Sequence, residues 1–400
     1  MTTTTVFIDG RIVLPDQVLE QHRVVVRDGT IQAIEPASDR LPDGASIVRL
    51  DGKLLTPGMI DIHIHGGGGA DFMDATPQAV RTVCQSHLRH GTTTLFPTTT
   101  TGTPEQIEAM LMACREVQQA NHIDSGAKIA GVHLYGPYFA EDKVGAHKKI
   151  YARTPQPSEY DDYFRDGLVK IATCAAELPG AAAFYRAAMA AGCLVTCGHS
   201  NSTFPEMAEA FRNGMRHVDH FWNAMSSVTS LRPRCGTPMQ ASMEQFVLLE
   251  PEMSTEVIAD GQHLSDELLY FAYRMKGVER LCLVTDSSRA LDMEPGRYIF
   301  GPIDDGDWFV YDGQVGRSVE TGNLASSVAG MDHMVRTMYR VTGGNLADTI
   351  RMASLTPAER TGLEEQIGSI EVGKRADLVV WSPELEVQAV YLEGRLAVAP

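Results

Sequence analysis

Apolar residues in the middle of the chain come in short runs separated by longer segments with helix-like spacing. Runs of strand length are Met59–Ile64, Thr92–Phe96, Ile129–Leu134, Val169–Thr173, Leu194–Cys197, His217–Asp219, Thr255–Ile258 and Leu281–Thr285. Helical spacing is found in Pro104–Gln119, Gly180–Ala191, Pro205–Asn213 and Asp266–Met275. Alternating strands and helices predict a parallel sheet of the α/β class, and eight repeats favour a closed (β/α)₈ TIM barrel over an open sheet.

The two ends of the chain have a different residue pattern, in which runs of β-branched residues alternate with Asp-Gly turns typical of hairpins. We therefore predict a small β domain assembled from residues 1–55 and 365–400, around a barrel domain of residues 56–364. The alternative is that these segments add edge strands to the main fold.

Charge and cysteine content narrow the class of protein. The formal net charge of −17 argues against a nucleic-acid partner. The seven cysteines are scattered, with no zinc-ribbon or disulfide spacing, which indicates reduced thiols and a cytoplasmic protein. No apolar run reaches the roughly 20 residues that cross a bilayer, so we expect no membrane partner.

Polar residues able to bind a metal ion follow several predicted strands. His63 and His65 lie two residues apart on the first strand and therefore point to one face. The fifth, sixth and eighth strands end at His199, His220 and Asp286. Each has an ordinary explanation, a loop hydrogen bond for a histidine or a helix cap for the aspartate. Together, at the carboxyl ends of barrel strands, they predict a divalent metal site.

Longer strings around these residues resemble one family. TPGMIDIHIHG, GVHLYGPYF, KVGAHKKIYART, GHSNST, HVDHFWNAMS, IADGQH, LVTDSSRALDMEPGRY and GSIEVGKRADLVVW occur in the order found in that family. They are similar to the N-acetylglucosamine-6-phosphate deacetylase family of the amidohydrolase superfamily. The resemblance spans nearly the whole chain, from about Thr56 to Trp381.

The resemblance implies a metal-bearing (β/α)₈ barrel with a β-sandwich formed from both termini, a homodimer, and removal of the acetyl group from an amino sugar phosphate. It implies a divalent ion, zinc in the first place, with ligands among His63, His65, His199, His220 and Asp286. Asp286 takes the catalytic role: it accepts a proton from the attacking water and returns one to the departing amine. The substrate contacts implied are Gly136, His147, Asn223, Ala224, Arg234 and His263.

Two departures from the family pattern change these expectations. Tyr135 stands where the family motif HLEGP has a glutamate ligand, and a neutral phenol is a poor ligand for a divalent ion. We therefore expect one ion, at His63, His65, His199 and Asp286, with His220 free to bond water or substrate. The alternative is a tyrosinate stabilised by two cations.

The second departure lies in SSVTSLRPRCGTP, where the family's phosphate-binding string is disrupted. Arg232 and Arg234 are both candidates for the phosphate contact, and neither aligns cleanly. The substrate class is therefore less well defined than the reaction.

Other functions remain open on the sequence. One is an amidohydrolase or deaminase that acts on another amide or amine. Another is a barrel without catalytic activity that serves as a scaffold. The replacement of a metal-ligating glutamate by Tyr135 favours this alternative. Retention of five convergent metal-competent side chains argues against the scaffold, which has no need of them.

Overall fold

The predicted strands are present in the computed structural model, which describes residues 3–120 and 122–399. One parallel sheet has the order β12-β11-β8, with β8 (Met59–Ile64), β11 (Thr92–Pro97) and β12 (Lys128–Ile129). A second runs in chain order through β13 (Val132–Leu134), β14 (Val169–Thr173), β15 (Leu194–Cys197), β16 (His217–Val218), β17 (Ser254–Ile258) and β18 (Leu281–Val284). The run Ile129–Leu134, predicted as one strand, is divided at Gly131 into β12 and β13.

Backbone contacts join these two sheets at both edges. A parallel bridge pairs Thr98, just beyond β11, with His133 of β13. At the other edge the N–H of Asp286 donates to the carbonyl of His63 at 2.9 Å, and the N–H of His65 donates to the carbonyl of Ser287 at 3.0 Å. The carboxyl end of β18 therefore lies against that of β8.

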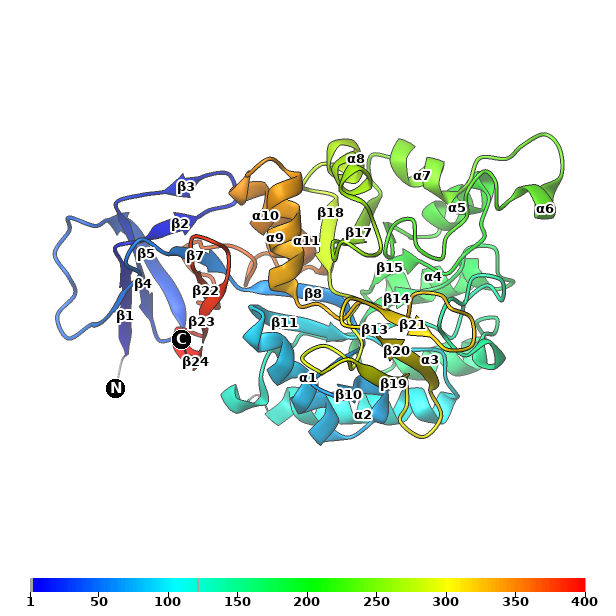
Figure 1. The fold of residues 1–400 in the computed structure, drawn as a ribbon, viewed down its shortest axis with the longest axis horizontal. Helices are drawn as coiled ribbons and strands as arrows, with labels where there is room; N and C mark the ends of the chain where they lie inside the picture. The colour runs from blue at the N-terminus through cyan, green and yellow to red at the C-terminus, as the bar shows by residue number, and fades with distance from the viewer. Residues whose placement is uncertain (1–2, 121, 400) are drawn as a thin grey trace.

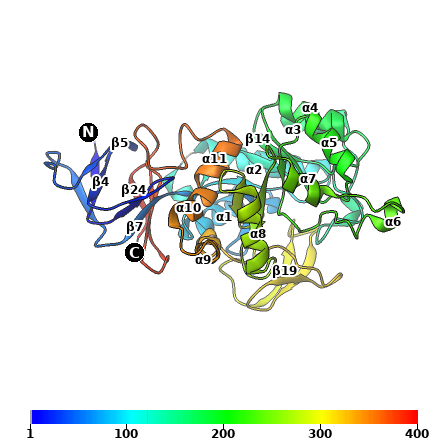
Figure 2. The ribbon, with the colours of Figure 1, turned by 90° about the horizontal axis from the view of Figure 1, so that it is seen from above.

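Helices lie outside the parallel strands (Figures 1 and 2). They are α1 (Pro77–Arg89), α2 (Pro104–Ala120), α3 (Pro157–Phe164), α4 (Ala181–Ala190), α5 (Phe204–Arg212), α6 (Arg232–Cys235), α7 (Met243–Leu249), α8 (Asp266–Lys276), α9 (Met331–Val341), α10 (Leu346–Ala353) and α11 (Leu355–Thr361). Short 3₁₀ helices are η1 (Phe72–Asp74), η2 (Ile123–Ser125) and η3 (Lys149–Tyr151). The four predicted helical segments correspond to α2, α4, α5 and α8.

Local sequence explains where these helices begin. Thr203 caps α5 by accepting from the N–H of Glu206, whose carboxylate accepts from the N–H of Thr203 in return. Thr76 caps α1, and Pro77 occupies its first position, where a missing N–H costs nothing.

Strands from both ends of the chain form two further sheets, at the left of Figure 1. One has the order β5-β4-β1-β6, with β1 (Thr4–Ile8), β4 (His22–Arg27), β5 (Thr30–Pro36) and β6 (Ser46–Arg49). The other has the order β24-β23-β22-β7-β2-β3, with β2 (Arg11–Val13), β3 (Val18–Leu19), β7 (Leu54–Pro57), β22 (Leu378–Trp381), β23 (Val387–Leu392) and β24 (Arg395–Val398). The antiparallel pairing of β22 with β7 joins the two ends of the chain.

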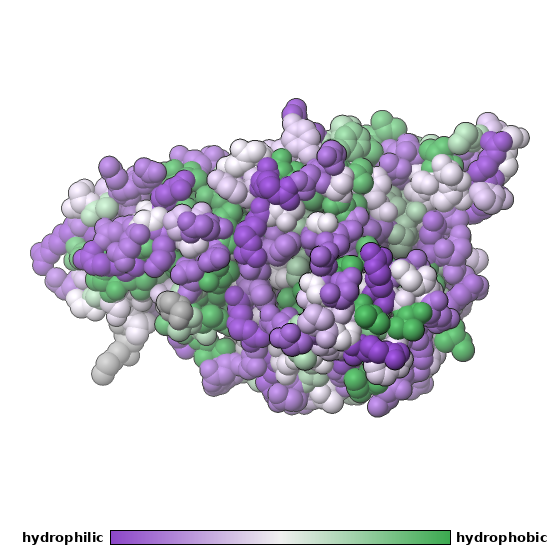
Figure 3. All heavy atoms as spheres, in the orientation of Figure 1, coloured by the Kyte–Doolittle hydropathy of each residue, from purple (hydrophilic) through white to green (hydrophobic). Residues whose placement is uncertain are grey.

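A small antiparallel sheet follows β18 and was not predicted from the sequence. It contains β19 (Gly296–Phe300), β20 (Asp307–Tyr311) and β21 (Gly316–Ser318), and a short hairpin of β9 (Gly66–Gly67) and β10 (Ala70–Asp71) follows β8. The fold is therefore of mixed α/β content. None of the helices in the described residues is long and apolar enough to span a bilayer. Figure 3 shows a face that is largely hydrophilic, with apolar side chains in small groups.

Candidate metal centre and active site

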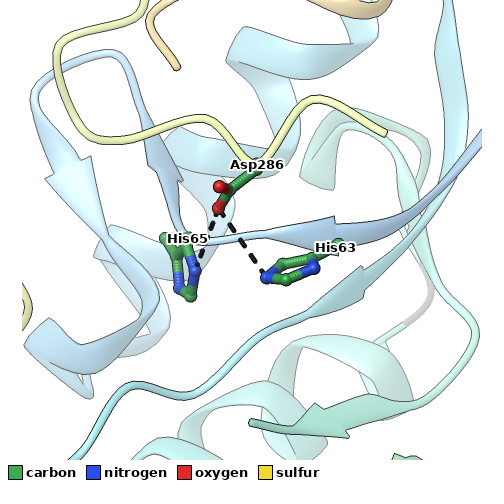
Figure 4. Close-up of side chains that lie close together, drawn as sticks. All are labelled: His63, His65 and Asp286. Atoms are coloured by element: carbon green, nitrogen blue, oxygen red, sulfur yellow. Dashed lines mark ion pairs between the residues drawn. The ribbon is translucent and has the colours of Figure 1, made fainter. Parts of the chain in front are cut away.

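His63 of β8, His65 directly after that strand and Asp286 just beyond β18 lie together (Figure 4). His63 and His65 point to the same face because successive residues of a strand alternate between its faces. The Oδ1 atom of Asp286 is 3.2 Å from Nε2 of His65 and 3.7 Å from Nε2 of His63. All three side chains are buried, and their candidate ligand atoms lie within 4.8 Å of one another. The geometry suits three ligands of one divalent ion.

Buried acidic side chains lie around this group, and sequence reasoning missed them. Glu256 of β17 accepts hydrogen bonds from Nδ1 of His63 and, at 3.0 Å, from the N–H of His220. Asp219 and Asp61 accept hydrogen bonds from buried threonine hydroxyls. A signal was present in the sequence, because each is a charge within or directly after a short apolar strand.

The carboxylates around His63 favour a positive charge at this point. Burial lowers the pKa of His63, but Glu256 and Asp286 outweigh burial and raise it to about 9. Burial also opposes ionisation of Asp286, yet the positive charge of His63 and the hydrogen bond from His65 hold its pKa below the usual value.

The Nε2 atom of His63 is the atom that a metal ion would use. It is buried and has no hydrogen-bond partner within residues 3–120 and 122–399, while Nδ1 of the same ring donates to Glu256. A carboxylate that accepts from the far nitrogen of a ligating imidazole fixes its tautomer and orientation. An ion here would receive this lone pair and supply the positive charge, so the residues present fit a divalent metal.

His199, His220 and Tyr135 form a second group. The Nε2 atoms of the two histidines are 3.3 Å apart, and the hydroxyl of Tyr135 is hydrogen-bonded to Nε2 of His220. Nδ1 of His199 donates to the carbonyl of Lys143 at 2.6 Å. His199 therefore faces His220, and its participation as a fourth ligand beside His63 stays a prediction.

Burial controls the charge of this second group. Burial, with neighbouring histidines, holds the pKa of His199 well below its usual value and lowers that of His220 to about 4. Burial and nearby carboxylates raise the pKa of Tyr135 well above 10. The group therefore consists of two neutral imidazoles and a neutral phenol.

The backbone bends sharply where these side chains leave their strands. His199, His220 and Asp286 have φ angles of 46°, 21° and 44°, in the left-handed region that residues other than glycine rarely adopt. Such conformations cost about 1–3 kcal/mol each and tend to occur at functional sites. Their occurrence at the ends of β15, β16 and β18 is consistent with a candidate functional site at this end of the sheet.

A cavity of about 380 Å³ is lined by members of both groups. Its walls include Tyr135, Lys143 and Asp286. The predicted ligands His199 and His220 line it, as do the predicted substrate contacts His147, Asn223, Ala224 and His263.

Gly136 and Arg234, also predicted as substrate contacts, do not line the cavity. Gly136 has a φ of 69° in the turn after β13, where a Cβ would lie 3.1 Å from the backbone nitrogen of Thr101. Arg234 belongs to α6, which projects at the far right of Figure 1. Its guanidinium forms a salt bridge with the carboxylate of Glu206 and donates to the carbonyl of Asn201 at 2.7 Å. Its hydrogen-bond donors are therefore directed to neighbouring protein groups.

Other lining residues were missed by sequence reasoning. Phe300 of β19 packs against His65, with ring centroids 5.2 Å apart. The hydroxyl of Ser326 lies 3.4 Å from Oδ1 of Asp286. Trp222 lies within the quoted string HVDHFWNAMS, but it was not singled out as a substrate contact.

Replacing Glu256 with glutamine is expected to weaken metal binding by about 10- to 100-fold, the usual effect of losing such an outer contact. The amide cannot accept from Nδ1 of His63 with the strength of a carboxylate, and it removes a negative charge. Competition with a chromophoric chelator would measure the affinity, with the exposed Glu252→Gln as control. Equal affinities in Glu256→Gln and the parent chain would contradict this role.

Comparisons with known proteins agree with the geometry. Residues 54–397 match the model of the amidohydrolase family. The chain is 32% identical to N-acetylgalactosamine-6-phosphate deacetylase from Escherichia coli O157:H7, over 97% of each chain. It is 31% identical to N-acetylglucosamine-6-phosphate deacetylase from Bacillus subtilis (strain 168), over 99% of this chain and 98% of the relative.

A solved structure shows the same similarity in three dimensions. The N-acetylglucosamine-6-phosphate deacetylase from Pasteurella multocida superposes with a TM-score of 0.90 at 26% identity, covering 99% of this chain and all of that one. The chain therefore belongs to the N-acetylglucosamine-6-phosphate deacetylase family of the metal-dependent amidohydrolases.

Proposed function

We propose that this chain hydrolyses the amide bond of an N-acetylated amino sugar phosphate, such as N-acetylglucosamine 6-phosphate, releasing acetate and the free amine. The observation that carries the proposal is the carboxylate of Asp286, which lines the cavity and touches the metal-competent His63 and His65. The named activities of the relatives support the same reaction.

Asp286 is the proton carrier in this proposal. Its depressed pKa keeps it ionised and ready to accept a proton from the attacking water. The same carboxyl group then donates that proton to the sugar nitrogen as the carbon–nitrogen bond breaks. His63, His65 and Asp286 would hold a divalent ion, for which zinc suits the donor set, and a bound ion would lower the pKa of a water molecule and polarise the acetyl carbonyl.

The cavity walls supply the contacts for the sugar and its phosphate. Within the described part of the chain, Lys143 is the one lysine or arginine among the lining residues. The imidazole of His263 is oriented by Asp260, whose carboxylate lies 2.8 Å from Nδ1. We assign Lys143, His263 and the Asn223–Ala224 backbone to the phosphate and His147 to the sugar. Arg234 could bind the phosphate only after its salt bridge with Glu206 is broken.

The finer architecture is part of the proposal. The β-bridge at one junction of the two parallel sheets and the backbone hydrogen bonds at the other support one closed (β/α)₈ barrel. A shared apolar cluster, to which Phe7 and Val24 contribute from one terminal sheet and Leu55 and Leu378 from the other, supports a β-sandwich. We place the sandwich in residues 1–55 and 365–400 and the barrel in 56–364; β7 extends two residues beyond the first boundary.

The remaining assignments follow from the family and the thiols. We propose a homodimer on the family resemblance. The binding partner is the small amino sugar substrate, and we propose no nucleic-acid or membrane partner. Cytoplasmic location is supported by the seven cysteines, all of which are free thiols.

The substrate assignment is tested with N-acetylglucosamine and N-acetylgalactosamine, each with and without a 6-phosphate. We expect kcat/KM to be about tenfold or more higher for the phosphorylated sugars, because a charge-assisted contact contributes about 1.5–3 kcal/mol. Lys143→Met should reduce that advantage and leave the plain sugars unaffected, whereas the exposed Lys149→Met should not. Equal efficiency on phosphorylated and plain sugars would exclude the phosphate site.

A further inference from the structure

Tyr135 lies between the two groups of metal-competent side chains. Its ring centroid is 4.3 Å from that of His63 and 5.3 Å from that of His199, and the residue is 1% exposed. The hydroxyl of Thr99 accepts a hydrogen bond from the backbone N–H of Tyr135 at 2.8 Å and donates one to the backbone carbonyl of Tyr135 at 2.9 Å. The phenol is therefore fixed in place, and it lines the cavity together with Asp286.

The protons of the neighbouring imidazoles can be assigned by counting donors and acceptors. The carbonyl of Lys143 only accepts, so Nδ1 of His199 carries the hydrogen and its Nε2 is a bare lone pair. Nε2 of His220 lies 3.3 Å from that lone pair, and a hydrogen bond between the two nitrogens places the hydrogen on His220. Nδ1 of His220 is then an acceptor, and no donor reaches it among the described residues.

This tautomer of His220 determines whether the hydroxyl of Tyr135 accepts or donates in its hydrogen bond with His220. The one hydrogen on Nε2 of His220 is shared between the lone pair of His199 and the oxygen of Tyr135, which is the nearer acceptor. The O–H of Tyr135 is then left over, and no other hydrogen-bond partner contacts it within residues 3–120 and 122–399. A buried hydroxyl donor at the wall of a substrate cavity is thus available to a ligand atom.

We infer that Tyr135 is a catalytic residue whose hydroxyl donates a hydrogen bond to the acetyl carbonyl oxygen of the substrate. The inference rests on the proposed deacetylation. In that reaction a water oxygen bonds to the carbonyl carbon, and negative charge develops on the carbonyl oxygen. The carbon–nitrogen bond then breaks, and Asp286 carries the proton from water to nitrogen, giving acetate and amine. Tyr135 keeps its own proton throughout.

The placement of Tyr135 suits this role. A donor already fixed in a water-poor site stabilises developing charge more than bulk water does, because nothing has to reorient during the reaction. Tyr135 also lies between His63 and the pair formed by His199 and His220, where the related family motif has a carboxylate ligand. The phenol, supported by His220, takes the place of a second positive centre at the carbonyl oxygen.

Tyr135→Phe tests the inference because it keeps the ring and removes only the hydroxyl. We expect kcat on N-acetylglucosamine 6-phosphate to fall by about 10²- to 10³-fold, the usual effect of losing one such donor, with KM nearly unchanged. Metal content, measured by elemental analysis, should stay at one ion per chain. Tyr138→Phe is the matched control, since Tyr138 is equally buried in the same loop and its hydroxyl has no partner among the described residues.

Three results would overturn the role of Tyr135: wild-type kcat in Tyr135→Phe, an equal loss in Tyr138→Phe, or loss of the bound ion together with kcat. Two ions per parent chain would also overturn it, because Tyr135 would then act as a ligand. Failure of the proposed function gives a different pattern, in which the parent chain itself releases no acetate.

Discussion

Asp286→Asn is expected to lower kcat for acetate release by about 10²-fold or more, the typical contribution of a general base and acid. The amide has nearly the shape of the carboxylate, but it cannot accept the proton from water or return it to the sugar nitrogen. Because the pKa of Asp286 is held below its usual value beside His63 and His65, the parent group is ionised throughout the neutral range.

The measurement is kcat on N-acetylglucosamine 6-phosphate with the metal content determined on the same sample. Metal content separates proton transfer from ligation, since Asp286 is also a candidate ligand. Asp304→Asn, at an exposed position near β20, is the control and should match the parent chain. Turnover like that of the parent chain in Asp286→Asn would remove Asp286 from the mechanism.

Removing the ion is expected to have an effect of similar size. Protein purified without chelator should contain one equivalent of divalent metal per chain, zinc by the donor set of two imidazoles and a carboxylate. Chelation should reduce activity to background, and added zinc should restore it. The double variant His63→Ala, His65→Ala should lose the ion, because only Asp286 of the three grouped ligands would remain.

His122→Ala serves as the control, because His122 is an exposed histidine far from β8 in the sequence. One equivalent retained after the His63 and His65 replacements would place the ion elsewhere, with His199 and His220 the next candidates. Two equivalents in the parent chain would contradict a single site.

Much of the fold could be predicted from hydrophobic pattern, for a physical reason. Strands buried on both faces are continuous apolar runs, so β8, β14 and β15 have the bounds predicted for them. The sheet of β19, β20 and β21 was missed because its strands are only partly buried and carry no such pattern. Its contribution to the site, Phe300, was therefore missed as well.

The candidate site was predictable where one local rule places the side chain. His63 and His65 follow from strand alternation, and Asp286 from the end of β18. Arg234 could not be placed, because its position depends on α6 and on a pairing with Glu206, far from it in sequence. Glu256 was missed because its partner, His63, lies on a strand distant in sequence.

The function of Tyr135 was also beyond the sequence, which showed only that a phenol replaces a carboxylate. Its hydrogen bond to His220 and the carbonyl of Lys143 behind His199 determine which atom holds each proton. Those contacts join separate loops, and only the folded chain brings them together.

The most direct measurement is the products formed from N-acetylglucosamine 6-phosphate by the zinc-loaded chain, with acetate and free amine quantified in the same reaction. We expect both in equal amounts, no ammonia, and loss of both products in Asp286→Asn. Ammonia in place of acetate would indicate a deaminase. Absence of acetate from every N-acetylated amino sugar phosphate would contradict the proposed deacetylation.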